Sequence, residues 1–346
     1  MWLLILLGVA IVVGLLIGTV LFLLERRRAG GYPIHLLPPE MRPKFRQALK
    51  SLKKRGPPPQ RTEVYSLDQL PPALLPRAEE IRDTVRPCVR LTAVRTDEEM
   101  DPAASKFGGR PCIGEDSPWP TSESGKPMTF IGQVNFAELT TALAEKAQTP
   151  PAGLPAEGVF VFFYDLEEMR WGFDPKDSGF WCFRWIPDPP KIVPRKNIPE
   201  QQWPPRPCKL VPKVGDSLPT YGDEVAFPAD FSDPEWHAYF DLCEDVLPKV
   251  DHKLLGHPNI IQDDPRFTAQ LAGNGFYCGD PESVRSIPHL DELRKGLSDW
   301  QLLWQIDSDE APAFMWGDAG RLYIMIRDQD LQAGRLDTAW VVLQCG

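Results

Sequence analysis

The stretch Trp300–Leu331, WQLLWQIDSDEAPAFMWGDAGRLYIMIRDQDL, decides the fold because an earlier part of the chain repeats its elements in the same order. Phe130–Asn135 (FIGQVN) aligns with Leu302–Asp307 (LLWQID) without a gap. A Gly-x-Pro precedes each segment, and a glycine that opens an apolar run follows each one, at Gly158 and Gly320. These matches in series indicate a duplicated unit, and two copies with so long a period exclude a solenoid.

The pattern predicts an α+β protein in which residues 88–346 form a single mixed or antiparallel β-rich domain. Two pseudo-symmetric halves are expected at about 88–190 and 250–346, and mainly loops and edge strands are expected at 187–233. Strands are predicted at Cys88–Val94, Gly158–Leu166 and Phe180–Trp185, and helices at Arg77–Thr84, Phe136–Ala147 and Pro234–Val246. The last helix is expected to gather its large side chains on one face: Trp236, Tyr239, Phe240 and Cys243.

The N-terminal segment predicts a membrane anchor. Residues 2–24 carry no charge, and as a helix they would reach roughly 35 Å, which exceeds the ~30 Å hydrocarbon core. A transmembrane helix over residues 1–25 is favoured over a signal peptide because a basic start and a cleavage motif are both missing. The arginines that follow indicate a single-pass protein of the bacterial inner membrane with a cytosolic C-terminal domain.

Residues 26–87 are expected to form a basic amphipathic helix and a proline-rich tether. The basic segment 26–55 is expected to bind membrane lipids together with residues 2–24. Within Arg42–Arg55, an apolar stripe recurs at helical spacing: Phe45, Ala48, Leu49 and Leu52. That helix could lie on the membrane surface or pack on its own domain, and both arrangements predict the same stripe.

Charge divides the chain into a basic and an acidic part. Residues 25–96 hold 16 Lys and Arg against 7 Asp and Glu, whereas residues 97–346 hold 22 against 41. An acidic domain repels phosphate backbones, so nucleic acid is not expected as a partner. The seven cysteines are dispersed and form no C-x-x-C pair, which indicates free thiols in a reducing compartment.

Several motifs occur in an order that resembles the YwqG-like family, a bacterial domain family of unknown function. They are Gly108–Pro111, Trp119-Pro120, the strand with Gln133, Leu255–Pro258 with Gln262, Gln305–Asp307, Gly317–Gly320, Asp330-Leu331 and Val342–Cys345. The resemblance covers the chain from about Cys88 to its end. It implies a single α+β domain and supplies no catalytic residues.

Polar residues on apolar strands are the first candidates for ligand binding: Gln133, Asn135, Gln305 and Asp307. Strict alternation along a strand places the first pair on the face of Ile131 and the second pair on the face of Leu303. A structural alternative is that strand amides satisfy buried backbone groups and were copied by duplication without any role in binding.

Four further residues complete the ligand-binding candidates: His252, Trp316, Asp318 and Arg321. In the first interpretation, the domain is a cytosolic binding or scaffold module that holds a protein or small ligand on an aromatic-rich face. In the alternative, it is a hydrolase-like enzyme in which Asp307, Asp318 and His252 meet between the halves. The run Asp307–Glu310 lacks the spacing of an EF-hand and the histidines lack H-x-x-x-H, so no metal and no cofactor are expected.

Overall fold

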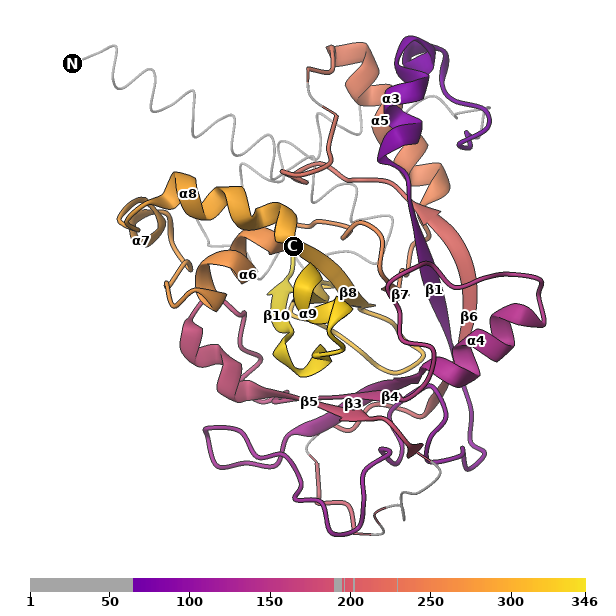
Figure 1. The fold of residues 1–346 in the computed structure, drawn as a ribbon, viewed down its shortest axis with the longest axis vertical. Coiled ribbons are helices and arrows are strands. Elements are labelled where there is room, and N and C mark those ends of the chain that lie inside the picture. The colour runs from indigo at the N-terminus through magenta and orange to yellow at the C-terminus, as the bar shows by residue number, and fades with distance from the viewer. Residues whose placement is uncertain (1–64, 190–194, 196, 202, 229) are drawn as a thin grey trace, which may run out of the picture. The chain divides into compact units, whose positions relative to one another are not determined.

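The computed structural model describes residues 65–189, 195, 197–201, 203–228 and 230–346. Within them, one ten-stranded sheet has the order β10-β9-β8-β7-β1-β6-β2-β3-β4-β5, and its pairings are antiparallel throughout. The sheet curls around an apolar interior to form a near-barrel (Figure 1). The strands are β1 Arg86–Arg95, β2 Lys106–Phe107, β3 Thr129–Asn135, β4 Val159–Tyr164, β5 Trp181–Ile186, β6 Cys208–Ser217, β7 Lys253–Leu254, β8 Trp300–Asp307, β9 Arg321–Arg327 and β10 Trp340–Gln344.

The strand order is the same when it is read from either edge, with β1–β5 matched to β6–β10. We call β1–β5 the first unit and β6–β10 the second unit. In both units the second, third, fourth and fifth strands pair in succession. The first strand of each unit lies in the other one, because β1 pairs with β7 and β6 pairs with β2. The two units are therefore interlocked through the long β1–β6 ladder.

The third strand of each unit contains a β-bulge at the same place. The pairing register shifts at Ile131 in β3 and at Leu303 in β8. A bulge adds one residue and reverses the alternation beyond it. The prediction that Gln133 shares a face with Ile131, and Gln305 with Leu303, is therefore wrong. Ile131 and Leu303 belong to the central core, whereas each glutamine hydrogen-bonds to the segments that flank β2 or β7.

Large side chains from both units fill the space inside the curled sheet. The Phe107 and Trp304 rings stack at 5.7 Å between centroids, and Phe160 lies 5.1 Å from Phe183. Two smaller apolar clusters cover the outer face of the sheet, one in each unit, and α6 contributes to the second. The first contains Cys112, Ile113, Met128, Phe130, Val159, Val161 and Phe163, and the second contains Ala269, Trp300, Leu302, Tyr323, Met325 and Val342.

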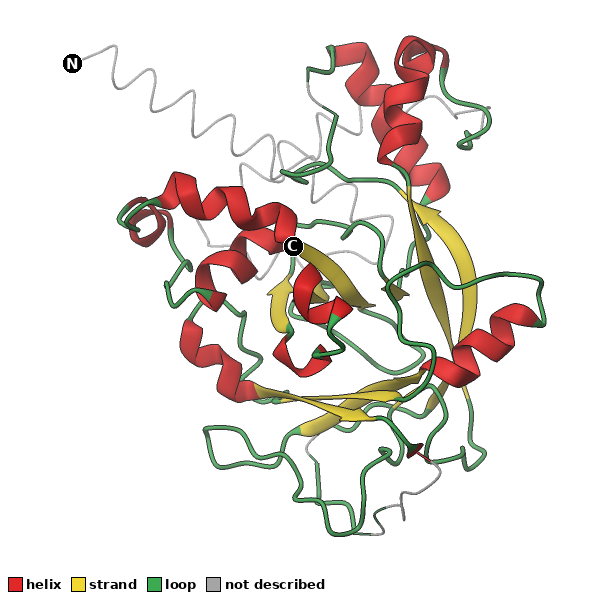
Figure 2. Cartoon of the chain, in the orientation of Figure 1, coloured by secondary structure: helices red, strands yellow, loops and turns green. Residues whose placement is uncertain are grey.

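Helices connect the strands, as Figure 2 shows. They are η3 Pro72–Arg77, α3 Ala78–Thr84, α4 Phe136–Ala144, η4 Pro175–Phe180, α5 Asp233–Val246, α6 Pro265–Gly273, α7 Pro281–Arg285, α8 Leu290–Lys295, η6 Gly296–Asp299, α9 Asp328–Gln332 and η7 Leu336–Thr338. The α5 helix packs beside η3 and α3 on one end of the near-barrel (Figure 1). The helix predicted at Pro234–Val246 is confirmed. The prediction that its large side chains share one face is wrong, since Tyr239 is 2% exposed and Phe240 is 53% exposed.

Two predictions about the fold require correction. The fold prediction included a transmembrane helix, yet no helix in the described part of the chain is long and apolar enough to cross a membrane. The predicted span over residues 2–24 and the basic segment 26–55 lie outside the described residues. Binding to lipids and location in the inner membrane, which were inferred from these two segments, therefore stay predictions. Residues 187–233, expected as loops and edge strands, contain β6, which lies in the middle of the sheet.

Gly256 lies against the β1–β6 ladder and provides a test of how closely the chain packs there. Its φ is +75°, and an added Cβ would clash with Ser217 Oγ of β6 and lie 2.9 Å from Cys88 Cβ of β1. We expect Gly256→Ala to lower the free energy of unfolding by about 2–3 kcal/mol through backbone strain and overpacking. The matched control is Gly275→Ala, because Gly275 has φ +90° and no neighbour within 4 Å, so only ~1 kcal/mol of backbone strain applies. Equal losses in urea denaturation would contradict the crowding seen at Gly256.

Candidate functional site

The two glutamines singled out in the sequence make equivalent hydrogen bonds in the two units. Gln133 Oε1 accepts from Cys112 N at 2.7 Å, and Nε2 donates to Ala104 O at 2.8 Å and to Pro102 O at 2.7 Å. Gln305 Oε1 accepts from Asn259 N at 2.8 Å, and its Nε2 donates to Asp251 O at 2.7 Å. Both side chains are fully buried. Each glutamine therefore joins the segments on both sides of the short second strand to the third strand.

A buried charged network lies beside Gln305 in the second unit. Lys253 Nζ donates to Asp251 Oδ2 at 2.8 Å and to Asn259 Oδ1. Arg90 Nε of β1 contacts Asp251 Oδ1 at 3.2 Å. Burial alone would raise the pKa of Asp251, but the two cations beside it hold that pKa below its ordinary value. Burial lowers the pKa of Lys253, and Asp251 opposes that change.

Asp307 and Arg321 extend this network. Asp307 Oδ2 accepts from Asp251 N at 3.0 Å, and Asp307 Oδ1 lies 3.0 Å from Arg321 Nε in an ion pair that lacks hydrogen-bond alignment. Arg321 Nη1 donates to Asn259 O at 2.9 Å, and Tyr323 Oη donates to the same carbonyl at 2.6 Å. Asp307 therefore connects the end of β8 to β9 and to the segment before β7.

His252 lies next to this network, and both of its ring nitrogens are engaged. Nδ1 accepts from Asp307 N at 3.0 Å, which places the ring proton on Nε2, 3.1 Å from Asp309 Oδ2. The ring packs edge-on against Phe107 at 4.9 Å. Burial would raise the pKa of Asp309, but the contacts from His252 and from Ala311 N lower it below its ordinary value. A general base needs a free lone pair that faces a substrate, and His252 offers none in this arrangement.

The other three candidates differ in how close they come to this centre. Trp316 is buried and its Nε1 donates to Asp307 O at 3.2 Å. Asn135 belongs to the first unit, where its Oδ1 caps α4 by accepting from Ala137 N and Glu138 N. Asp318 lies in the turn before β9 and is partly exposed, with its carbonyl accepting from Gly346 N. The structure therefore groups His252, Gln305, Asp307, Trp316 and Arg321, and leaves out Gln133, Asn135 and Asp318.

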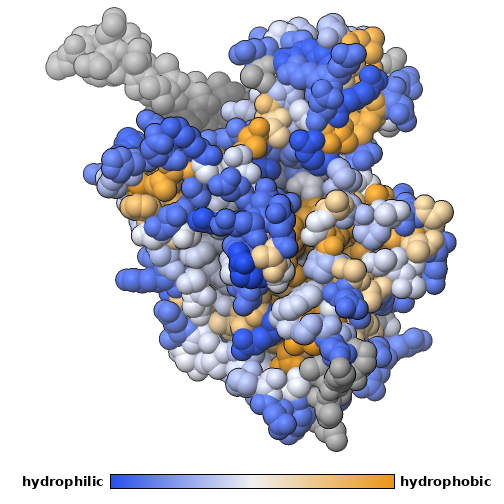
Figure 3. Space-filling model, viewed as in Figure 1, coloured by the Kyte–Doolittle hydropathy of each residue, from blue (hydrophilic) through white to orange (hydrophobic). Residues whose placement is uncertain are grey.

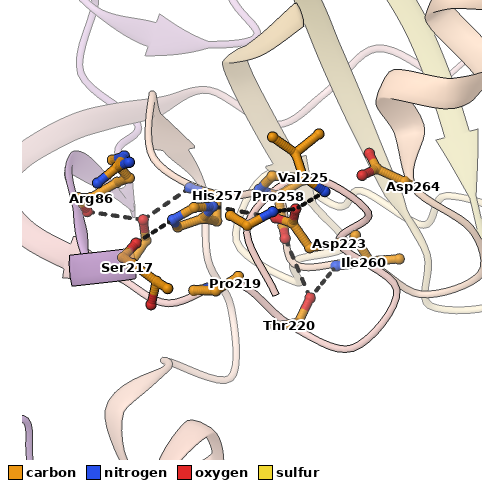
Figure 4. A network of polar contacts seen from close by, with 12 residues as sticks. Arg86, Ser217, Pro219, Thr220, Asp223, Val225, His257, Pro258, Ile260 and Asp264 are labelled. Carbon is orange, nitrogen blue, oxygen red and sulfur yellow. Dashed lines mark hydrogen bonds and ion pairs between the residues drawn. The ribbon is translucent and has the colours of Figure 1, made fainter. Parts of the chain in front are cut away.

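A second polar network, which the sequence did not predict, contains a serine, a histidine and an aspartate (Figure 4). Asp223 Oδ2 lies 3.3 Å from His257 Nδ1 in an ion-pair contact without hydrogen-bond alignment. The other ring nitrogen, Nε2, is 2.7 Å from Thr84 O. The Ser217 hydroxyl donates to Arg86 O at 3.0 Å and accepts from His257 N at 2.9 Å. A catalytic triad requires the histidine ring to take the serine proton, and here the ring faces a carbonyl instead.

Sequence reasoning missed the charged and polar partners because they are scattered along the chain. Nothing in their local sequence distinguishes them from exposed polar residues: Arg90, Asp223, Asp251, Lys253, Asn259, Asp264 and Arg266. The run Asp307–Glu310 does not converge, since Asp307 contacts Arg321 while Asp309 contacts His252. In the described ranges, no group of three or more His, Cys, Asp or Glu side chains could hold a metal ion.

The fold and these networks define a duplicated β-sheet domain with buried, hydrogen-bonded polar centres. A family model described as "Domain of unknown function (DUF1963)" matches residues 105–345, which include every strand from β2 to β10. The chain belongs to this family. The match is consistent with the resemblance to the YwqG-like family, although it does not fix that name. A search of curated proteins found no match.

Replacing Gln305 by Leu tests the architectural role of the glutamine bonds. The change leaves Asn259 N and Asp251 O unpaired in a buried place, so we expect a loss of about 1–3 kcal/mol in the free energy of unfolding. Gln133→Leu should cost a similar amount for the same reason. The control is Gln301→Leu on the same strand, whose partly exposed side chain donates to the Asp328 carboxylate. A loss at Gln305 no larger than at Gln301 would contradict this role.

The buried carboxylate of Asp223 should make the free energy of unfolding depend on pH. Burial would raise the pKa of Asp223, but contacts with His257 and Arg266 lower it from 3.8 to about 2. Its carboxylate therefore stabilises the folded state above about pH 4, and the contribution, roughly 2–3 kcal/mol, is lost as the pH falls through about 2. The difference in unfolding free energy between wild type and Asp223→Asn should shrink from about pH 6 to about pH 3. A difference that stays constant over this range would contradict the assignment.

Proposed function

We propose that this domain is a protein-binding module and that its partner contacts an aromatic surface on α5 and the loop before it. We define the aromatic surface as five side chains: Tyr221, Phe227, Phe231, Trp236 and Phe240. The observation that carries the proposal is the exposure of two of them, since Tyr221 is 65% exposed and Phe240 is 53% exposed, while the other three are partly exposed. Aromatic side chains on a protein surface are enriched where proteins bind one another.

The aromatic surface is ordered by contacts among its own rings. Trp236 lies 4.9 Å from Tyr221, 5.2 Å from Phe227 and 5.3 Å from Phe240, measured between centroids. The Arg77 guanidinium lies 4.4 Å from the centroid of Phe231. Such contacts restrict the rotamers before a partner arrives and reduce the entropy lost on binding. Apolar atoms are visible on the lobe that carries α3 and α5, at the top of Figure 3.

The arrangement of the polar groups supports binding over the hydrolase-like alternative. His252 uses both ring nitrogens, and Ser217 donates its proton to a backbone carbonyl. A groove of about 420 Å³ between α4 and β6 is lined by Ser105, Glu138 and Lys209 and includes neither His252 nor Ser217. A hydrolytic mechanism needs an accessible base or nucleophile, and these groups are buried and engaged.

A photo-crosslinking residue placed at Phe240 tests the proposal in living cells. We expect covalent adducts with one or a few proteins from position 240, and none from the matched position Tyr277, which is 47% exposed elsewhere on the surface. The double variant Trp236→Ala/Phe240→Ala should lose co-purification of the same proteins while the protein stays folded, with an unfolding free energy lowered by about 2–3 kcal/mol through the lost ring contacts.

The absence of adducts from position 240 would contradict the proposal. So would co-purification of the same proteins with the double variant, because the partner would then bind elsewhere. Tyr239→Ala provides a structural control, since Tyr239 is 2% exposed and its loss should lower stability rather than binding alone.

A further inference from the structure

The outward face of α5 combines aromatic and acidic side chains in helical register. Asp233, Trp236, Phe240 and Glu244 follow one another at spacings of three, four and four residues, which places them along one face of a helix. Two aromatic rings thus form the middle of the stripe, and a carboxylate lies about one turn beyond each ring. From Asp233 to Glu244, which are twelve residues joined by eleven steps along the helix, the stripe spans roughly 16 Å.

A neighbouring face of the helix holds α5 in place. Tyr239 and Leu242 are buried in a cluster with Leu70, Leu74, Ile81 and Leu218, and Tyr239 Oη donates to Pro219 O at 2.8 Å. Trp236 and Phe240 do not belong to this cluster. A capping box formed by Ser232 and Glu235 fixes the start of the helix. The stripe is therefore presented by a supported helix, whose main apolar anchors, Tyr239 and Leu242, lie outside the stripe.

Negative charge predominates on α5 itself, although Arg77 of η3 lies beside the aromatic surface, over Phe231. The α5 helix contains five carboxylates and no lysine or arginine: Asp233, Glu235, Asp241, Glu244 and Asp245. Two of them, Glu244 and Asp245, lie in the last turn, where the helix dipole adds further negative potential. The acidic excess of residues 97–346 has the same sign. A partner that binds here must bring apolar contacts to the rings and positive charge to their surroundings.

We infer that the aromatic surface takes an amphipathic helix of another protein that is rich in lysine and arginine. The inference rests on the proposed function and specifies its partner class. A helix packed along α5 would place apolar residues, spaced three and four apart, against Trp236 and Phe240. Its basic residues, one turn beyond at each end, would face Asp233 and Glu244. Anionic lipid, nucleic acid and an identical acidic surface of a second copy would all be repelled by the same charges.

Labelled peptides of about 14 residues test the inference by fluorescence anisotropy with the purified full-length protein. Three designed helices share one leucine stripe, and their polar positions are Lys, Gln or Glu. We expect the Lys helix to bind at least about tenfold tighter than the Gln helix, and the Glu helix more weakly still. Added salt should weaken the Lys helix most, because screening removes the electrostatic part of the affinity.

Two variants separate the aromatic from the electrostatic contribution. Trp236→Ala/Phe240→Ala should weaken the Lys helix at least about tenfold, and Asp233→Lys/Glu244→Lys should reverse the preference toward the Glu helix. The matched control, Glu282→Lys/Asp291→Lys, makes the same change in net charge on exposed residues of α7 and the start of α8. It should leave the affinity within about twofold.

Each other outcome overturns the inference in a recognisable way. Equal affinity for the Lys and Gln helices, unaffected by charge reversal, would refute the basic partner while leaving the aromatic surface as a docking site. A dimer in sedimentation experiments that the aromatic double variant abolishes would identify a second copy as the occupant. Failure of all three helices to bind would also refute the inference, whereas the crosslinking at Phe240 decides the proposed function separately.

Discussion

The β1–β6 ladder is the interaction on which the rest of the structure depends. Ten residue pairs join the two strands, from Arg86 with Ser217 to Arg95 with Cys208. Each strand also supplies the neighbour for the short second strand of the other unit, β7 or β2. Those second strands contain only two residues, so they could not stay in a sheet without a long partner on each side. The polar centre beside β7 is consequently a product of both units, since Arg90 of β1 completes it.

Comparison of the two units distinguishes the polar contacts that both units share from those that occur in only one of them. The glutamine of the third strand and the buried lysine of the second strand, Lys106 or Lys253, occur in both units. In the first unit the lysine Nζ is satisfied by the carbonyls of Asp101 and Pro102, whereas in the second unit it contacts the Asp251 carboxylate. A carboxylate partner is therefore not needed to satisfy the buried lysine of the second strand. A buried ion pair often adds little net stability. The pairing of the lysine with a carboxylate is therefore a feature of the second unit that the shared architecture does not need.

Local patterns predicted the repeated strands and the helices α3, α4 and α5, because these depend on nearby residues, whereas α6, α7, α8 and α9 were not predicted. The bulge at Ile131, the central place of β6 and the division of α5 into two faces were missed. Each depends on which distant segment lies alongside, and alternation or helical spacing contains no such information. The candidate site was only partly predictable for the same reason. Gln305 and Asp307 stand out as polar residues in an apolar strand, but their partner Asp251 resembles any surface acid until β7 is placed beside β8.

The aromatic surface and the duplicated sheet are held in place by different residues. The family match begins at residue 105, whereas Leu70, Leu74 and Ile81, which pack under α5, come before it. The lobe is tied to the sheet through His257, which follows β7 and contacts the carbonyl of Thr84 at the end of α3. Residues outside the matched region thus hold α5 in the position that exposes its aromatic stripe. Substitutions on the outward face of α5 can then change partner preference while the ladders, glutamine bonds and buried charges of the sheet stay intact, because none of those contacts includes the stripe.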